Sequence, residues 1–214
     1  CILAEYRLLA LKHQQILRDD NGAGFALIKT LVTSPLITKI ATGFGVRCIN
    51  TPTGFKWMAQ KMLKYEEQAQ TRIQEEEGIG LDFDSTELFT RMDILSRYST
   101  CTVLAAEESY GYLPLDLVRD KDGNASSLAI AEAFAYMEST GTNPLKFLDT
   151  IYQKYGYHQE KTENIYFPWQ PCPVEWQSKT GLPNIEELLF PDPGIFNGLL
   201  LQLMKVRSLS MRPD

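Results

Sequence analysis

The sequence predicts an α/β fold, with a mixed, largely parallel sheet flanked by helices and then an irregular, proline-rich extension containing a short β-hairpin. Three observations predict it. Helical and strand patterns alternate over residues 2–49, and this alternation builds parallel sheets. Apolar residues make up 44% of the 214 residues, which is enough to form a core. Prolines gather between 168 and 194, where they remove backbone N–H donors and so disfavour regular structure.

The first half of the chain contains the alternating elements. The turn-forming run Asp19-Asp20-Asn21-Gly22 ends the first helical pattern. Ser34-Pro35 then supplies a cap residue and a proline suited to the first helical position. The elements expected here are a helix at 2–18, a strand at 25–32, a helix at 35–42, a strand at 46–49 and a long helix at 55–77.

The second half continues the pattern and then loses it. Asn143-Pro144 is a further helix start, and Tyr155-Gly156 is a helix end. The elements expected are a loop with a short helix over 78–100, a strand at 102–106, helices at 124–139 and 144–155, and hairpin strands at 199–203 and 206–211. The sequence shows no internal repeats.

Composition excludes several classes of protein. The net charge of −6 and the isoelectric point near 5.1 argue against a general nucleic-acid surface, which needs clustered Lys and Arg. No apolar run approaches the roughly 20 residues that a membrane span requires, and no signal peptide is visible. Four widely spaced cysteines form no CxxC site, so we expect reduced thiols in a cytoplasmic protein: Cys1, Cys48, Cys101 and Cys172.

Two loops follow predicted strands and carry polar side chains. Residues 51–56 follow one strand, and residues 107–123 follow another. Ligands of open α/β sheets bind at the carboxyl ends of the strands. The Thr, Gly, Lys, Glu, Ser and Arg residues of these loops suit a polyhydroxylated, phosphorylated ligand.

These loops carry a resemblance to a known family. The run Thr51-Pro52-Thr53-Gly54-Phe55-Lys56-Trp57 resembles the TPTGxK segment of phosphoglucomutases. Glu107-Glu108-Ser109-Tyr110-Gly111 resembles the sugar-specificity loop, and Arg119-Asp120-Lys121-Asp122-Gly123 resembles the stretch after it. Two further segments also resemble the corresponding parts of these enzymes: Lys29–Ser34 and Tyr152–Tyr157. Residues 1–158 therefore resemble the third domain of α-D-phosphohexomutases, and residues 159–214 resemble a linker and the truncated start of the C-terminal phosphate-binding domain.

The resemblance implies a function and a set of site residues. These enzymes interconvert hexose 1-phosphate and hexose 6-phosphate through a bisphosphorylated intermediate, which turns over between the two steps. Glu107 and Ser109 would form hydrogen bonds with the ring hydroxyls of the sugar in both of its orientations. Hydrogen bonds from hydroxyls to a carboxylate are charge-assisted and therefore strong. The other residues implied are Thr53, Gly54 and Lys56 on the opposite wall, Arg119 and Lys121 toward the phosphate, and Arg212 in the phosphate-binding loop.

The resemblance also implies components that these 214 residues do not contain. Family members use Mg²⁺, a phosphoserine and hexose 1,6-bisphosphate as activator, but no Thr-Ala-Ser-His or DGDGDR segment is present. We therefore expect a fragment that is inactive alone, whose partners are a sugar phosphate and the missing N-terminal domains, with no nucleic acid and no membrane. Ala106 replaces the family's usual glycine, and no histidine ends the loop. The resemblance therefore does not identify which sugar phosphate is bound.

Two alternatives remain. The chain could be a non-catalytic sugar-phosphate-binding domain. Less favoured is a haloacid-dehalogenase-type phosphatase using Asp82 and Asp84, because Leu81-Asp82-Phe83-Asp84-Ser85-Thr86 resembles its DxDxT start. That chemistry needs a hydrophobic strand before the aspartates, and the acidic run at 75–77 is poor strand material. Asp84 or Ser85 capping a helix at 87–92 explains the acids more simply.

Overall fold

The computed structural model describes residues 1–109, 111–116 and 118–160. The predicted linker, the predicted hairpin and Arg212 lie outside these residues. No helix in the described part is long and apolar enough to cross a membrane.

A four-stranded sheet forms the centre of the described domain. Its strand order is β2-β1-β3-β4, with β1 (Phe25–Thr30) parallel to both β2 (Arg47–Thr51) and β3 (Cys101–Ala106). The two-residue β4 (Tyr112–Leu113) runs antiparallel to β3. Every residue of β1 and β3 is buried, as expected for inner strands covered on both faces. The predicted mixed, largely parallel α/β sheet is therefore confirmed.

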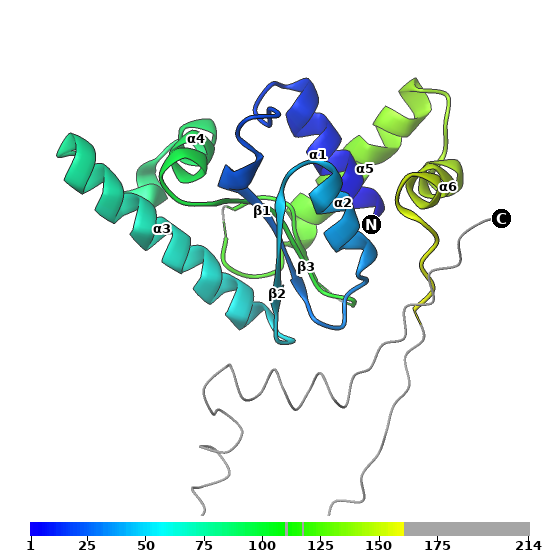
Figure 1. The fold of residues 1–214 in the computed structure, drawn as a ribbon, viewed down its shortest axis with the longest axis horizontal. Helices are drawn as coiled ribbons and strands as arrows, with labels where there is room; N and C mark the ends of the chain where they lie inside the picture. The colour runs from blue at the N-terminus through cyan, green and yellow to red at the C-terminus, as the bar shows by residue number, and fades with distance from the viewer. Residues whose placement is uncertain (110, 117, 161–214) are drawn as a thin grey trace, which may run out of the picture. The chain divides into compact units, whose positions relative to one another are not determined.

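In the described part of the chain, six α-helices flank the sheet. Figure 1 shows α3 and α4 on one side of the strands and α1, α2 and α6 on the other. Two of the helix starts follow from the sequence: the Asp122 carboxylate accepts from the N–H groups of Asn124 and Ala125, and Asn143 caps the helix that begins at Pro144. The helices are α1 (Ile2–His13), α2 (Leu36–Gly43), α3 (Phe55–Glu77), α4 (Leu88–Tyr98), α5 (Gly123–Ser139) and α6 (Pro144–Tyr155).

Three local predictions differ from the structure. The first helix ends at His13, because Gln15 takes a left-handed φ of 59° and the N–H groups of Ile16 and Leu17 close onto Leu11. The first strand ends at Thr30, where a turn begins that Thr33 closes with its N–H. The predicted caps for the helix after residue 87 are wrong. The carboxylate of Glu87 accepts from Thr90, while Asp82 caps the short 3-10 turn η2 (Phe83–Ser85).

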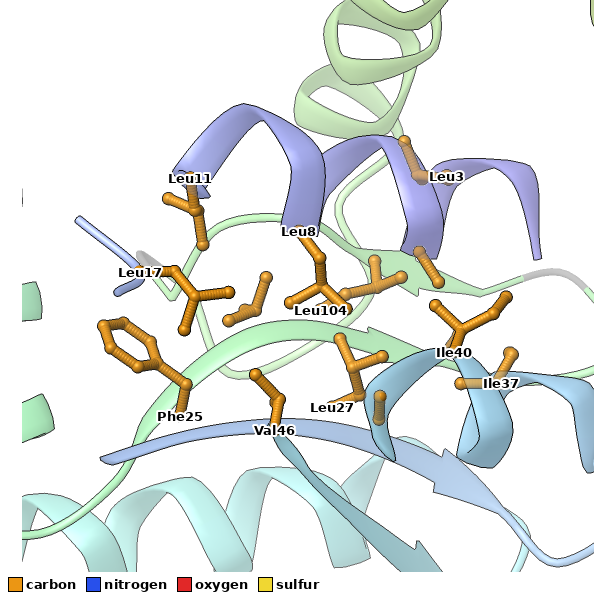
Figure 2. Packing of buried hydrophobic residues seen from close by; sticks show 14 of the residues in the cluster. Leu3, Leu8, Leu11, Leu17, Phe25, Leu27, Ile37, Ile40, Val46 and Leu104 are labelled. Atoms are coloured by element: carbon orange, nitrogen blue, oxygen red, sulfur yellow. The ribbon is translucent and has the colours of Figure 1, made fainter. Parts of the chain in front are cut away.

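The larger hydrophobic core lies under α1, α2, α5 and α6. Figure 2 shows Leu8 of α1 pointing toward Leu27 and Leu104 of the strands, with Ile40 of α2 beside them. A second core lies under α3, where Met58 and Met62 pack on strand residues that include Ile28 and Ala105. The domain therefore has helix–sheet–helix layers.

Leu8→Ala is expected to lower the free energy of unfolding by about 2–5 kcal/mol, because it removes a fully buried side chain and leaves a cavity. The matched control is Leu145→Ala at the start of α6, where the side chain is 76% exposed. That change should stay within about 0.5 kcal/mol of the parent. Urea denaturation of both variants checks the prediction, and equal losses would contradict the position of the core.

The parallel strands bring three loops to one edge of the sheet. β1, β2 and β3 all end there, and the N–H of Leu31 after β1 donates to the carbonyl of Thr51 at the end of β2 at 2.9 Å. The loop after β2 leads directly into α3, and the loop after β3 leads into β4. Residues far apart in sequence therefore meet at this edge.

Candidate functional site

The loop after β3 is closed on itself and tied to its neighbour by one residue, Glu107. The Glu107 N–H donates to the carbonyl of Gly111 at 2.9 Å, which closes the loop. The Glu107 carboxylate accepts at Oε1 from the N–H of Gly54 at 2.7 Å, across 53 positions of sequence. Gly54 immediately precedes α3, where backbone N–H groups favour an anion. The structure thus brings together Glu107 and Gly54, two of the predicted site residues.

Two glycines allow this close approach. Gly54 has a φ of 114°, a conformation that side chains other than hydrogen strongly disfavour. A Cβ on Gly111 would lie 2.5 Å from a ring carbon of Phe55 and 3.2 Å from Glu107 Oε2. The ring of Phe55 therefore packs directly against the backbone of Gly111, and the loop depends on glycine at that position.

Gly111→Ala is expected to lower the free energy of unfolding by about 1–3 kcal/mol, because the Phe55 ring must move away from the new methyl group. Gly123→Ala is the matched control, since a Cβ there meets nothing within 4 Å. The control should leave stability unchanged or raise it by about 0.4–1 kcal/mol. Thermal and urea unfolding of the two variants decide the matter. A destabilised control with a neutral Gly111→Ala would contradict the described packing.

A second set of hydrogen bonds reaches the same loop from β1. The carboxylate of Glu108 accepts at Oε2 from the Thr30 hydroxyl at 3.0 Å, and the hydroxyls of Thr30 and Thr33 lie 2.6 Å apart. Lys29 is buried, and its Nζ donates to the carbonyls of Thr30 and Thr33 at 3.2 and 2.9 Å. Burial lowers the pKa of Lys29 below its usual value. The sequence analysis assigned no contact to Glu108, so this bond to Thr30 was not predicted.

The predicted cations lie in different surroundings. Lys121 Nζ lies 5.4 Å from the centre of the Phe55 ring and 3.1 Å from Asp120 Oδ1, which places it beside the Glu107 loop. Lys56 is exposed, with Nζ 4.9 Å from the centre of the Trp57 ring. Arg119 instead forms an ion pair with the buried carboxylate of Glu66 on α3. The role of Arg119 as a phosphate ligand stays a prediction, and in the structure its guanidinium is paired with Glu66 instead.

The two hydroxyl side chains of the predicted site are exposed. Thr53 lies in the loop before α3, and Ser109 lies in the loop after β3. Together with Glu107 and Lys121, they give this edge one anchored carboxylate, hydroxyl groups and a lysine. That set can accept hydrogen bonds from hydroxyls and attract a phosphate, which is the chemistry of a sugar-phosphate ligand.

A metal centre is not found among the described residues. No three His, Cys, Asp or Glu side chains in this part of the chain are grouped so that they could hold an ion. Mg²⁺ prefers carboxylate oxygens in octahedral geometry, and the acids of the loop, Glu107 and Glu108, bond instead to Gly54 and Thr30. The described residues therefore do not fit the magnesium site that the resemblance implies.

A cavity of the described part lies elsewhere. It encloses about 580 Å³ and is lined by residues that include Asn21 and Gly24, just before β1 begins, and Ser96 of α4. It therefore lies at the amino-terminal edge of β1, away from the loops that follow the strands, and no predicted site residue lines it. The candidate site is an open loop surface.

An α/β domain with these groups at the carboxyl edge of its sheet belongs to the class that binds polar ligands there. Comparison with known proteins finds a match over part of the chain. Residues 4–83 match the model "Phosphoglucomutase/phosphomannomutase, alpha/beta/alpha domain III". Over residues 4–83 the chain is therefore similar to this third domain, and its distant homologues in the α-D-phosphohexomutase superfamily cover much of its length.

The similar proteins are distant and much longer. A Schizosaccharomyces pombe protein named "Probable phosphoribomutase" is 27% identical over 167 residues, which cover 78% of this chain and 22% of that protein. The Homo sapiens "Glucose 1,6-bisphosphate synthase" is 26% identical over 158 residues, covering 74% and 20%. A "Phosphoglucomutase" of Staphylococcus saprophyticus is 22% identical over 201 residues, covering 93% and 29%. The chain thus spans about a fifth of the length of the first two relatives.

Proposed function

We propose that this chain is the sugar-recognition part of a phosphohexomutase, which interconverts hexose 1-phosphate and hexose 6-phosphate through a bisphosphorylated intermediate. The observation that supports it is the anchoring of Glu107 by Gly54 and Gly111 at the carboxyl edge of the sheet, beside Lys121. The family match ends at residue 83, so the role of this loop depends on its geometry and on the sequence motif.

The geometry suits a ligand that must bind in two orientations. A carboxylate can accept hydrogen bonds from two neighbouring ring hydroxyls, and these charge-assisted bonds are strong. Because adjacent hydroxyls recur around a hexose ring, the same carboxylate can hold the sugar either way round. In this proposal Glu107 and Ser109 hold the ring, Thr53, Gly54 and Lys56 form the opposite wall, and Lys121 attracts phosphate as a point charge.

The remaining parts of the proposal concern the rest of the enzyme. The names of the relatives include ribose, pentose and glucose phosphates, so we propose the general class of sugar phosphates with adjacent hydroxyls. Mg²⁺, the phosphoserine and the hexose 1,6-bisphosphate activator would act with other domains of the enzyme. Residues 159–214, with Arg212, would begin the phosphate-binding domain, and we place the reaction in the cytoplasm.

Of the two alternative functions, a non-catalytic binding domain is compatible with the same site, whereas a phosphatase is not supported by the structure around Asp82. A non-catalytic domain that binds sugar phosphates would use the same loop. The phosphatase reading needs a strand before Asp82, but residues 78–82 have no regular structure. The Asp82 carboxylate accepts from the N–H of Asp84 at 3.1 Å, and both side chains are exposed. These acids form a capped turn and lack the buried strand that would hold a nucleophile.

The test is a titration of the 214-residue chain with glucose 1,6-bisphosphate, followed by amide NMR. The largest shifts are expected at Gly54, Glu107, Gly111 and Lys121, because these groups meet at the proposed site. Shifts confined to the cavity near Asn21 and Gly24 would contradict the proposal.

The same chain is expected to show no turnover of glucose 1-phosphate with Mg²⁺ and the bisphosphate, because it contains neither the phosphoserine segment nor the aspartate loop. Mutase activity above a heat-treated control would contradict the division of roles between domains. Release of inorganic phosphate would instead support a phosphatase.

A further inference from the structure

The segment between β4 and α5, residues 114–116 and 118–122, carries Lys121. At its end, the Asp122 N–H donates to the carbonyl of Tyr112 at 3.0 Å, and the Asp122 carboxylate caps α5. Lys121 has a neighbouring acid, Asp120, on the same segment. The segment also contacts α3 and α4.

A cluster of four charged side chains, three of them buried, supplies that contact. Glu66 of α3 is 3% exposed, and its Oε1 pairs with Arg91 of α4 while its Oε2 pairs with Arg119 of the segment. Asp116, also in the segment, has Oδ1 3.5 Å from Nη2 of Arg91. We call Glu66, Arg91, Asp116 and Arg119 the Glu66 cluster.

Two members of the cluster are held rigidly by the helices. The Arg91 side chain is buried, donates from Nη1 to the carbonyl of Phe83 at 3.1 Å, and lies 5.2 Å from the centre of the Phe83 ring. Glu66 lies three turns along α3 from Phe55, the ring beside Lys121. Breaking a buried charge pair is costly because it leaves the other charge uncompensated. Arg119, by contrast, is 42% exposed and forms the connection to the segment.

The connection extends to Lys121 through a short length of chain. Lys121 is two positions after Arg119, and two residues span at most about 7 Å. A shift of the Arg119 anchor therefore moves Lys121 relative to the Phe55 ring. We propose that Glu66 is a positioning residue, which through Arg119 holds the β4–α5 segment so that Lys121 stays beside Phe55 and the Glu107 loop.

This proposal and the direct-ligand role of Arg119 predict opposite results. If Arg119 binds phosphate directly, Glu66→Gln frees its guanidinium and binding improves or stays equal. If Glu66 positions the segment, Glu66→Gln and Arg119→Ala weaken the same interaction, so the double variant is no worse than either single one. The ligand part of this comparison depends on the proposed function, whereas the behaviour of the segment does not.

The first measurement is amide hydrogen exchange on the 214-residue chain without ligand. Glu66→Gln and Arg119→Ala are expected to speed exchange at Asp122 and Glu107 about tenfold, the size that loss of one charged hydrogen bond gives. Exchange at Leu27 and Ile28 of the central strand should not change. Arg119→Lys should recover part of the protection, and Arg97→Ala should have no effect, since that arginine forms an exposed pair with Asp93 within α4.

The second measurement is the affinity of the same variants for glucose 1,6-bisphosphate. Glu66→Gln, Arg119→Ala and the double variant should all bind about tenfold more weakly, whereas Arg97→Ala should bind as the parent does. Unchanged exchange at Asp122 and Glu107, or tighter binding by Glu66→Gln, would overturn the proposal. If the parent chain binds no sugar phosphate, the proposed function fails, while the exchange result still decides the positioning role. If Glu66→Gln does not fold, the half-exposed Arg119→Ala carries both measurements.

Discussion

Glu107→Ala is expected to weaken binding of glucose 1,6-bisphosphate by about a hundredfold, the largest effect of any single side chain at the site. Two charge-assisted hydrogen bonds to ring hydroxyls contribute roughly 1.5–3 kcal/mol each. Water entering the gap recovers part of this, so the net loss is about 3 kcal/mol, or roughly two factors of ten. The change also removes the acceptor for the Gly54 N–H, which loosens the start of α3. Isothermal titration of the 214-residue chain measures the effect.

The neighbouring residues provide matched controls within one loop. Ser109→Ala removes a neutral hydroxyl and should cost less than Glu107→Ala. Glu108→Ala removes an exposed carboxylate whose described bond goes to Thr30, so stability should fall by about 1 kcal/mol and affinity should stay within about threefold. The assignment of the loop is wrong if Glu107→Ala binds within threefold of the parent while Glu108→Ala loses most of the affinity.

The sequence predicted the sheet well because its signals are local. Apolar runs at 25–32 and 102–106, with the loop at 51–54 after the second strand, mark three strand ends, and parallel strands bring such ends to one edge. From the sequence one could expect only that Glu107 and Gly54 lie near each other, not that they form a hydrogen bond. Which carboxylate oxygen meets which N–H depends on the φ of Gly54 and on the Phe55 ring, and neither has a sequence pattern of its own.

The contacts that sequence reasoning missed are those between distant, isolated residues. Glu66 and Arg91 are 25 positions apart, and Glu66 and Arg119 are 53 apart. In the sequence, Glu66 is one acid in a polar helix, where a solvated position is the ordinary expectation. The short β4 was missed because two residues carry no detectable alternation. These features are fixed by tertiary packing of α3, α4 and the β4–α5 segment.

Asp116→Asn is expected to stabilise the chain near pH 7 and to lose that advantage as the pH falls. Burial, and then the nearby Glu66, raise the pKa of Asp116 to about 6, and Arg91 opposes this only in part. In the unfolded chain the pKa of this carboxyl is near the ordinary aspartate value of 3.8. The folded state therefore binds the proton more tightly, and the parent gains stability as the pH falls from about 6 toward about 4. Above pH 6 the ionised, buried form costs about 2–3 kcal/mol.

The measurement is urea denaturation of the parent and Asp116→Asn between about pH 4.5 and 7.5. The neutral asparagine should exceed the parent by about 2–3 kcal/mol at the upper end, and the gap should close toward the lower end. Asp120→Asn is the matched control in the same segment. The backbone N–H and then the ammonium of Lys121 lower the pKa of the exposed Asp120, so its small, screened effect should have the opposite sign. A gap for Asp116→Asn that stays flat with pH, or widens on acidification, would show that Asp116 is not held as a buried, costly charge beside Glu66 and Arg91.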